Sequence, residues 1–187
     1  MIRPGIGDVP NILSALRLLA APLAAYLIIA DHDTAALLIF AAAGLSDGLD
    51  GFIARRWGVT SDFGAWLDPL ADKLLMLLSF AALFVVGVAP LWLLALIVAR
   101  DVVIVIGWLL VKLLTLPMPT SPLFVGKLST VVQLLYVLSA LLLLAFDLDA
   151  PRLAQAAAWA CGAVTVLSAA AYGGVFLRGV FRGRRTA

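Results

Sequence analysis

Cysteine and histidine are nearly absent from the 187-residue chain, which contains one of each, Cys161 and His32. A single cysteine excludes an intramolecular disulfide. Charged residues are also scarce, at 13% of the sequence, and the formal net charge is only +2. Nucleic-acid-binding domains usually carry a much stronger basic surface, so the composition gives no support for a nucleic-acid partner.

Apolar residues dominate instead, at 64% of the sequence. Runs of about 20 apolar residues, the length that crosses a bilayer, recur down to the end of the chain, so one removable signal cannot account for them. The pattern predicts an all-α integral membrane protein, a bundle of six transmembrane helices formed by one domain over residues 1–187. Polar or turn-forming stretches separate the predicted spans, which cover residues 9–30, 35–55, 63–86, 91–114, 124–146 and 153–177.

Basic residues are distributed unevenly between the ends of these spans. If both termini are cytoplasmic, the outer side holds only Arg152, and the excess of positive charge on the inner side predicts this N-in, C-in orientation. Residues 1–8 are expected to form an interfacial segment, and residues 178–187 a basic cytoplasmic tail beside anionic headgroups. The inner basic residues are Arg3, Arg55, Arg56, Lys112, Lys127, Arg178, Arg182, Arg184 and Arg185.

Four aspartates interrupt the second and third apolar segments. Asp47 and Asp50 are three residues apart, and Asp68 and Asp72 are four apart, so each pair lies on one face of its predicted helix. A short loop joins the two helices, which allows all four carboxylates to converge. Ionisable side chains inside a membrane are costly, and they call for a partner or a function.

Bound divalent cations explain the acidic cluster best. Four carboxylates without an equal number of interleaved basic residues would repel one another or take up protons. Oxygen ligands with no histidine or cysteine nearby favour Mg²⁺ or Mn²⁺ over zinc, and carboxylates bridging two ions would suit a phosphate-containing substrate. The alternative is that separate aspartates cap helices or pair with Arg55, Arg56 and Lys73.

The acidic stretch resembles the motif of the CDP-alcohol phosphatidyltransferase family, D-x2-D-G-x2-A-R-x8-G-x3-D-x3-D. All of the motif's fixed positions match, and the predicted six-helix size is also typical of the family. The resemblance implies a homodimeric enzyme that transfers a phosphatidyl group from CDP-diacylglycerol to an alcohol and releases CMP. The matching residues are Asp47, Asp50, Gly51, Ala54, Arg55, Gly64, Asp68 and Asp72.

The resemblance also implies roles for these residues. Asp47, Asp50 and Asp68 would hold metal, and Asp72 would join the second metal and act as general base on the acceptor hydroxyl. Direct transfer is expected rather than a covalent histidine intermediate, because His32 falls in a predicted outer loop, remote from the acids. The residues implied to contact the CDP part of the donor are Gly51, Ala54, Arg55 and Gly64.

Sequence outside the motif bears on the acceptor. "GKLSTVVQLL" at 126–135 is similar to the branch of the family that makes phosphatidylglycerol phosphate or cardiolipin, and within that branch "RDVVIVIG" at 100–107 is similar to eukaryotic-type cardiolipin synthases. Ser129 stands where phosphatidylglycerol phosphate synthases commonly have a second lysine. Losing that cation weakens attraction for a dianion more than for a phosphodiester lipid, which favours phosphatidylglycerol over glycerol 3-phosphate as acceptor. Cardiolipin is then the expected product, and glycerol 3-phosphate remains the alternative acceptor.

Three further basic residues lie in or beside predicted spans. Arg100 and Lys127 are expected to contact an acceptor or lipid phosphate. The alternatives are that Arg100 pairs with Asp101 or another buried acid and that Lys127 reaches the membrane interface along its alkyl stem. Arg17 is expected to help line the donor pocket.

An acid-lined cation transporter is a reading from a different functional class. Transport favours acids distributed along a path and inverted repeats, whereas these acids cluster near one membrane face and no repeat is evident. The compact chain without a transit-like N-terminus favours a bacterial inner membrane, with the active site opening to the cytoplasm.

Overall fold

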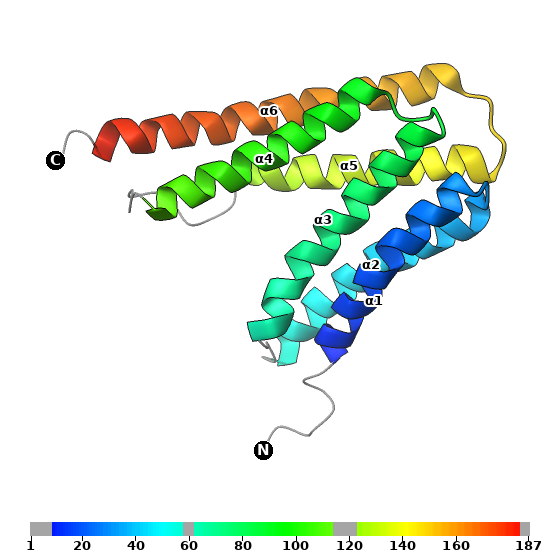
Figure 1. The fold of residues 1–187 in the computed structure, drawn as a ribbon, viewed down its shortest axis with the longest axis horizontal. Helices are drawn as coiled ribbons and strands as arrows, with labels where there is room; N and C mark the ends of the chain where they lie inside the picture. The colour runs from blue at the N-terminus through cyan, green and yellow to red at the C-terminus, as the bar shows by residue number, and fades with distance from the viewer. Residues whose placement is uncertain (1–8, 58–61, 114–122, 184–187) are drawn as a thin grey trace. The chain divides into compact units, whose positions relative to one another are not determined.

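The structure, a computed structural model, describes residues 9–57, 62–113 and 123–183, with side chains over 12–46, 67–113 and 123–178. All regular structure within these ranges is α-helical, as predicted (Figure 1). Its six helices are α1 (Val9–Ile29), α2 (Asp33–Trp57), α3 (Asp62–Val85), α4 (Leu91–Leu113), α5 (Phe124–Ala145) and α6 (Pro151–Gly183).

The predicted spans agree with these helices to within two residues at every end but one. The exception is α6, which continues to Gly183, so the first residues of the predicted basic tail are helical. Four helices are long and apolar enough to cross a membrane, over Ile12–Ile29, Leu91–Leu113, Phe124–Ala145 and Pro151–Arg178. The helices α2 and α3 are as long as α4, at 25 and 24 residues or about 36 Å, but both carry aspartates.

Three helices end in the same hydrogen-bonded motif. Asp31, Gly87 and Asp147 follow α1, α3 and α5 with φ values of 56°, 79° and 48°. In each case the next residue donates its backbone N–H to the carbonyl five positions earlier at 2.9 Å, which is the Schellman arrangement. The stretches that follow the first, third and fifth predicted spans therefore begin with defined turns, and each of these bonds satisfies a carbonyl group near a helix end. The three bonds are His32 to Leu27, Val88 to Leu83 and Leu148 to Leu143.

The chain forms two compact units, and the first contains α1, α2, α3 and the last part of α5. Within it, α1 packs against both α2 and α3, running in the same direction as α3 and opposite to α2 (Figure 1). The buried positions of α1 recur every three or four residues, so they form one helix face. The small residues Ala21 and Ala24 on this face let the helices approach closely. The buried positions are Ser14, Arg17, Ala21, Ala24 and Ile28.

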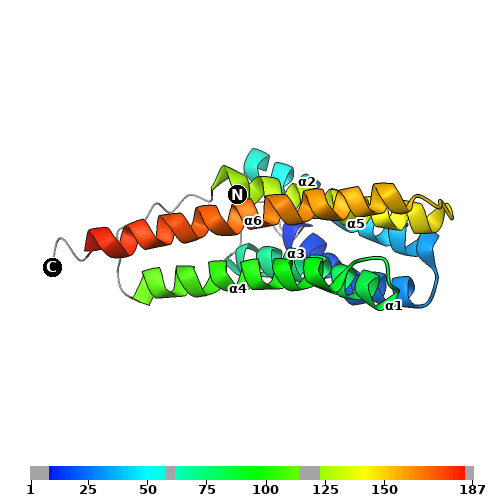
Figure 2. The ribbon, with the colours of Figure 1, turned by 90° about the horizontal axis from the view of Figure 1, so that it is seen from above.

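The second unit contains α4, the first part of α5 and α6. The helices α4 and α6 pack along each other and run in the same direction (Figure 2). Trp92 near the start of α4 stacks on Trp159 of α6, with ring centroids 4.8 Å apart. Large apolar side chains such as Leu109 and Leu167 are exposed on these helices, which suits contact with lipid rather than water.

Candidate active site

Two carboxylates mark the described part of the candidate active site. Asp68 and Asp72 lie one helical turn apart on α3, and about two fifths of each side chain is exposed, 37% for Asp68 and 41% for Asp72. The spacing predicted from the sequence therefore places both acids on one face of a helix. Their partial exposure leaves carboxylate oxygens available to a ligand.

Arg17 of α1 lies against both of these acids. Its Nη1 atom donates to Asp72 Oδ1 at 2.8 Å and lies 3.8 Å from Asp68 Oδ1. The Arg17 side chain is completely buried, whereas the carboxylates are open on another side. A buried guanidinium is tolerated when it is paired with acids, so this contact explains how α1 carries an arginine in its packed face.

Ser14, one turn before Arg17, completes the contact between the two helices. Its hydroxyl donates a hydrogen bond to Asp68 Oδ1, and its side chain is fully buried. Because α1 and α3 run in the same direction, Ser14 meets Asp68 and Arg17 meets Asp72 at successive levels. One face of α1 thus holds both Asp68 and Asp72.

The two motif acids of α2 are described by their backbone alone. Asp47 and Asp50 both lie within α2, so the predicted helical spacing between them is present. Their side chains, and those of Ala54 and Arg55, lie outside the described residues, as do any contacts around Gly51 and Gly64. Among the side chains that the structure does describe, no three metal-ligating groups gather at one point.

The described acids fit a hard divalent cation. The Oδ1 atoms of Asp68 and Asp72 face the buried Arg17, and the exposed part of each carboxylate side chain is left for an ion. Carboxylate oxygens are the ligands that Mg²⁺ and Mn²⁺ prefer. Asp68 and Asp72 could therefore supply part of a metal site, with the remaining ligands expected from Asp47 and Asp50.

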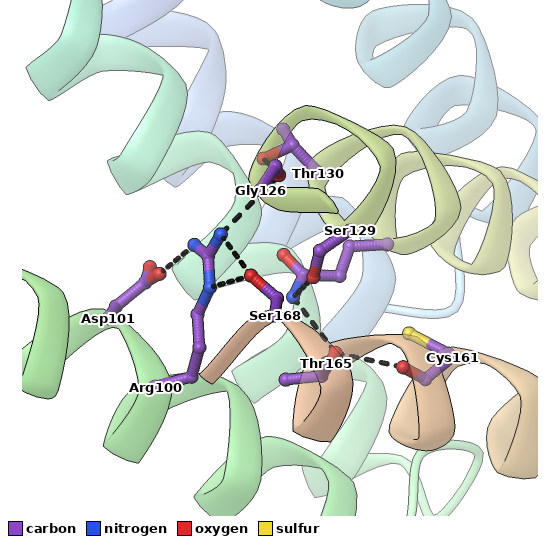
Figure 3. Close-up of polar contacts among 9 residues, drawn as sticks. Arg100, Asp101, Gly126, Ser129, Thr130, Cys161, Thr165 and Ser168 are labelled. Atoms are coloured by element: carbon purple, nitrogen blue, oxygen red, sulfur yellow. Dashed lines mark hydrogen bonds and ion pairs between the residues drawn. The ribbon is translucent and has the colours of Figure 1, made fainter. Parts of the chain in front are cut away.

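A second polar cluster surrounds Arg100 in the other unit (Figure 3). The Arg100 side chain is 5% exposed, and its Nη1 donates to Asp101 Oδ1 at 2.7 Å. Its Nε and Nη2 donate to Ser168 Oγ at 3.3 and 3.1 Å, and Nη2 also reaches the carbonyl oxygen of Gly126 at 3.4 Å. Arg100 therefore ties α4 to the first turn of α5 and to α6. The ion pair with Asp101 is one of the alternatives that the sequence allows for this residue.

An aromatic ring closes the Arg100 cluster. The guanidinium carbon of Arg100 lies 5.9 Å from the ring centroid of Tyr172, within the range of a cation–π contact. A β-carbon added to Gly126 would lie 2.6 Å from the Tyr172 hydroxyl oxygen, so only glycine fits there without a shift. Lys127, the next residue, has an exposed side chain. Of the two residues predicted to contact phosphate, Arg100 is therefore buried and Lys127 is accessible.

Sequence reasoning missed a buried amide network between α5 and α6. Gln133 Nε2 donates to Ser129 Oγ at 3.3 Å and to Thr165 Oγ1 at 3.2 Å, and the Thr165 hydroxyl donates to the Cys161 carbonyl at 2.8 Å (Figure 3). The signal was present, because polar side chains at one-turn spacing in an apolar helix usually face another helix. Ser129, which stands where related enzymes commonly have a lysine, accepts a hydrogen bond in this network.

Comparisons with known proteins show which family profile the chain matches and which proteins it is similar to. The family profile described as CDP-alcohol phosphatidyltransferase matches residues 8–167. A cardiolipin synthase (CMP-forming) of Rattus norvegicus is 36% identical over 87% of this chain and 59% of its own length. The Streptomyces coelicolor protein of the same name is 38% identical over 72% of this chain and 65% of its own.

A relative with a different acceptor in its name is nearly as similar. The chloroplastic CDP-diacylglycerol–glycerol-3-phosphate 3-phosphatidyltransferase 1 of Oryza sativa subsp. japonica is 32% identical over 89% of this chain and 56% of its own length. The chain thus spans less than two thirds of each of these three relatives. The profile match covers most of the sequence, including the whole acidic motif, and the chain belongs to the CDP-alcohol phosphatidyltransferase family.

Proposed function

We propose that the chain transfers the phosphatidyl group of CDP-diacylglycerol to a hydroxyl of phosphatidylglycerol, giving cardiolipin and CMP. The observation that carries this proposal is the pair of half-exposed carboxylates, Asp68 and Asp72, in the positions of the family motif. The names of the rat and Streptomyces relatives support cardiolipin as the product.

The proposed reaction is a direct displacement at phosphorus. The acceptor hydroxyl loses its proton to Asp72 while its oxygen attacks the phosphate attached to diacylglycerol. The bond from that phosphorus to the oxygen bridging to CMP breaks, and CMP leaves with the electron pair. Asp72 suits the base role because it is accessible and is held by Arg17, so it can stand within reach of a bound hydroxyl.

Divalent ions would assist from the acidic cluster. We propose that Asp47, Asp50, Asp68 and Asp72 together hold two ions, Mg²⁺ or Mn²⁺, which would neutralise phosphoryl oxygens and the departing phosphate. Asp68 contributes an accessible carboxylate whose orientation is set by Ser14.

The donor and acceptor are proposed to bind through separate residues. The residues proposed for the CDP part of the donor are Gly51, Ala54, Arg55 and Gly64. Lys127 is proposed to attract an acceptor phosphate because its side chain is exposed. Arg100 is also proposed for the acceptor side, although a direct phosphate contact would have to share the guanidinium with Asp101 and Ser168.

Glycerol 3-phosphate is the second candidate acceptor, and the rice relative's name favours it. A glycerol 3-phosphate site must attract a dianion. Ser129, which replaces the second lysine, is hydrogen-bonded to Gln133. The site therefore lacks that cation, which supports the lipid acceptor instead.

The proposed arrangement in the membrane is six spans with both termini inside the cell. The two acidic helices, α2 and α3, would cross as well, since their lengths suffice. The catalytic acids would then lie near the cytoplasmic face of a bacterial inner membrane, and the working form would be a homodimer.

A purified-protein assay tests the function. CMP release from CDP-diacylglycerol is measured with Mg²⁺ and either phosphatidylglycerol or glycerol 3-phosphate. We expect release and a cardiolipin product with phosphatidylglycerol alone, loss of turnover in Asp72→Asn, and normal turnover in Asp149→Asn, whose carboxylate is exposed in the turn before α6. Turnover with glycerol 3-phosphate alone would select the second acceptor, and no CMP release with either would reject the function.

A further inference from the structure

Ser14 and Arg17 of α1 do not belong to the acidic motif, yet they contact two of its members. We propose that they are positioning residues, which set the carboxylates of Asp68 and Asp72 in the orientation needed to bind divalent ions. This inference rests on the function proposed above and assigns that site a further structural part on α1.

The pairing is specific in its geometry. Ser14 donates to Oδ1 of Asp68, and Arg17 donates to Oδ1 of Asp72 at 2.8 Å while staying 3.8 Å from Asp68. Each acid thus has its own donor, and the guanidinium also restrains the distance between the two carboxylates. Carboxylates that bind metals are commonly fixed in this way by hydrogen bonds from residues behind them.

Burial restricts the side-chain positions of the two donors on α1. Ser14 and Arg17 are both completely enclosed, whereas more than a third of each carboxylate side chain is exposed. The donors therefore approach from the protein side and leave the open side of the acids to a ligand. Serine has a short side chain, so it reaches Asp68 only because the two helix backbones lie close together.

The packing of α1 on the C-terminal side of these residues accounts for the short distance between the helices. Ala21 and Ala24 continue the same face and are fully buried, and Ala71 between the two acids is fully buried on α3. Small side chains at such positions allow two helices to approach until short polar groups meet. The site thus depends on α1 for its shape, although the motif lies only on α2 and α3.

The test measures Mn²⁺ binding to the purified full chain without any lipid or nucleotide, by the electron paramagnetic resonance signal of free Mn²⁺. Wild type is compared with Ser14→Ala, Arg17→Gln and Arg17→Lys. Loss of groups that orient metal ligands typically weakens binding by about 10- to 100-fold, and we expect this range for Arg17→Gln and about its lower end for Ser14→Ala. Arg17→Lys keeps the charge without the planar fork and is expected to fall between Arg17→Gln and wild type.

A matched control separates positioning from general packing. Ser79→Ala removes another fully buried hydroxyl from α3, about two turns beyond Asp72, and should bind Mn²⁺ as wild type does. The thermal unfolding midpoint is measured for every variant. If Arg17→Gln does not fold, Ser14→Ala and Arg17→Lys carry the comparison.

The outcomes are distinct. Weakened Mn²⁺ binding in folded Ser14→Ala and Arg17→Lys, together with a fall in kcat larger than the change in KM for phosphatidylglycerol, supports the proposal. Binding equal to or tighter than wild type in both variants overturns it, because the donors would then be neutral or would compete with the ion. A wild-type protein that binds Mn²⁺ but releases no CMP would reject the proposed function while leaving the binding comparison intact.

Discussion

Trp92 of α4 stacks on Trp159 of α6, and the outer edge of the Trp92 ring lies directly over Gly162. A β-carbon at Gly162 would come within 2.6 Å of the ring. Trp159 packs against the ring, so a shift of Trp92 away from Gly162 also disturbs this stacking. This pair and the glycine therefore limit how closely the first turn of α4 approaches the third and fourth turns of α6.

Gly162→Ala is expected to lower stability. The added methyl group must displace the Trp92 ring, and overpacking of this kind costs about 1–3 kcal/mol. The melting temperature in detergent, followed by size-exclusion chromatography after heating, measures the effect. Gly173→Ala in the same helix is the control, because a β-carbon there meets nothing within 4 Å and alanine favours helix. Equal melting temperatures for the two variants would contradict the proposed crowding.

Arg100→Lys is expected to lower the melting temperature and also to raise KM for phosphatidylglycerol. Lysine cannot bond Asp101, Ser168 and the Gly126 carbonyl from one planar group, so the ties to α5 and α6 would be lost. Ser168→Ala should reproduce part of this loss of stability. A lower melting temperature at unchanged KM would contradict the proposed acceptor contact and leave Arg100 with a structural role alone.

Gln133→Leu is expected to cost about 1 kcal/mol of stability. The change removes one interhelical hydrogen bond, to Thr165, and one to Ser129 of the same helix, and interhelical hydrogen bonds in membranes average about 0.6 kcal/mol each. Thermal unfolding in detergent measures the loss. Thr130→Val serves as control, since the Thr130 hydroxyl bonds only the Gly126 carbonyl of its own helix among the contacts described. A neutral or stabilising Gln133→Leu would show that the network is dispensable.

Chelation is expected to abolish CMP release. Removal of divalent ions with EDTA leaves the carboxylates of Asp68 and Asp72 with Arg17 but without a second cation. Activity should return on adding Mg²⁺ or Mn²⁺ in excess of the chelator and should not return with Ca²⁺, which prefers more ligands at longer distances. Turnover that persists after exhaustive chelation would contradict the metal-dependent mechanism.

The helices could be predicted from the sequence because apolar length and turn residues are local signals. Asp31, Gly87 and Asp147 stand at the ends of α1, α3 and α5, where a residue with positive φ terminates the helix. The predicted span ends at Leu177, the last residue of an apolar run, and agrees with the apolar span Pro151–Arg178, while the helix itself continues past Arg182 to Gly183.

The acidic site could be predicted only in part. The spacing of Asp68 and Asp72 is a property of one helix and is present as expected. The partners of Arg17 depend on the register of α1 against α3, which is set by packing between residues more than fifty positions apart. A buried arginine in an apolar helix signals an acidic partner, but the sequence does not say which acid.

The face that α1 turns toward α3 changes character along its length, from Ser14 and Arg17 at one end to Ala21, Ala24 and Ile28 at the other. Sliding α1 by a single turn in one direction would bring the methyl group of Ala21 opposite Asp72, and sliding it in the other direction would leave the Arg17 guanidinium near Leu75. The order of polar and small side chains on α1 therefore fits α3 in one register. A chimaera that imports α1 from another family member should work only if that helix carries its own hydroxyl and guanidinium at these two levels.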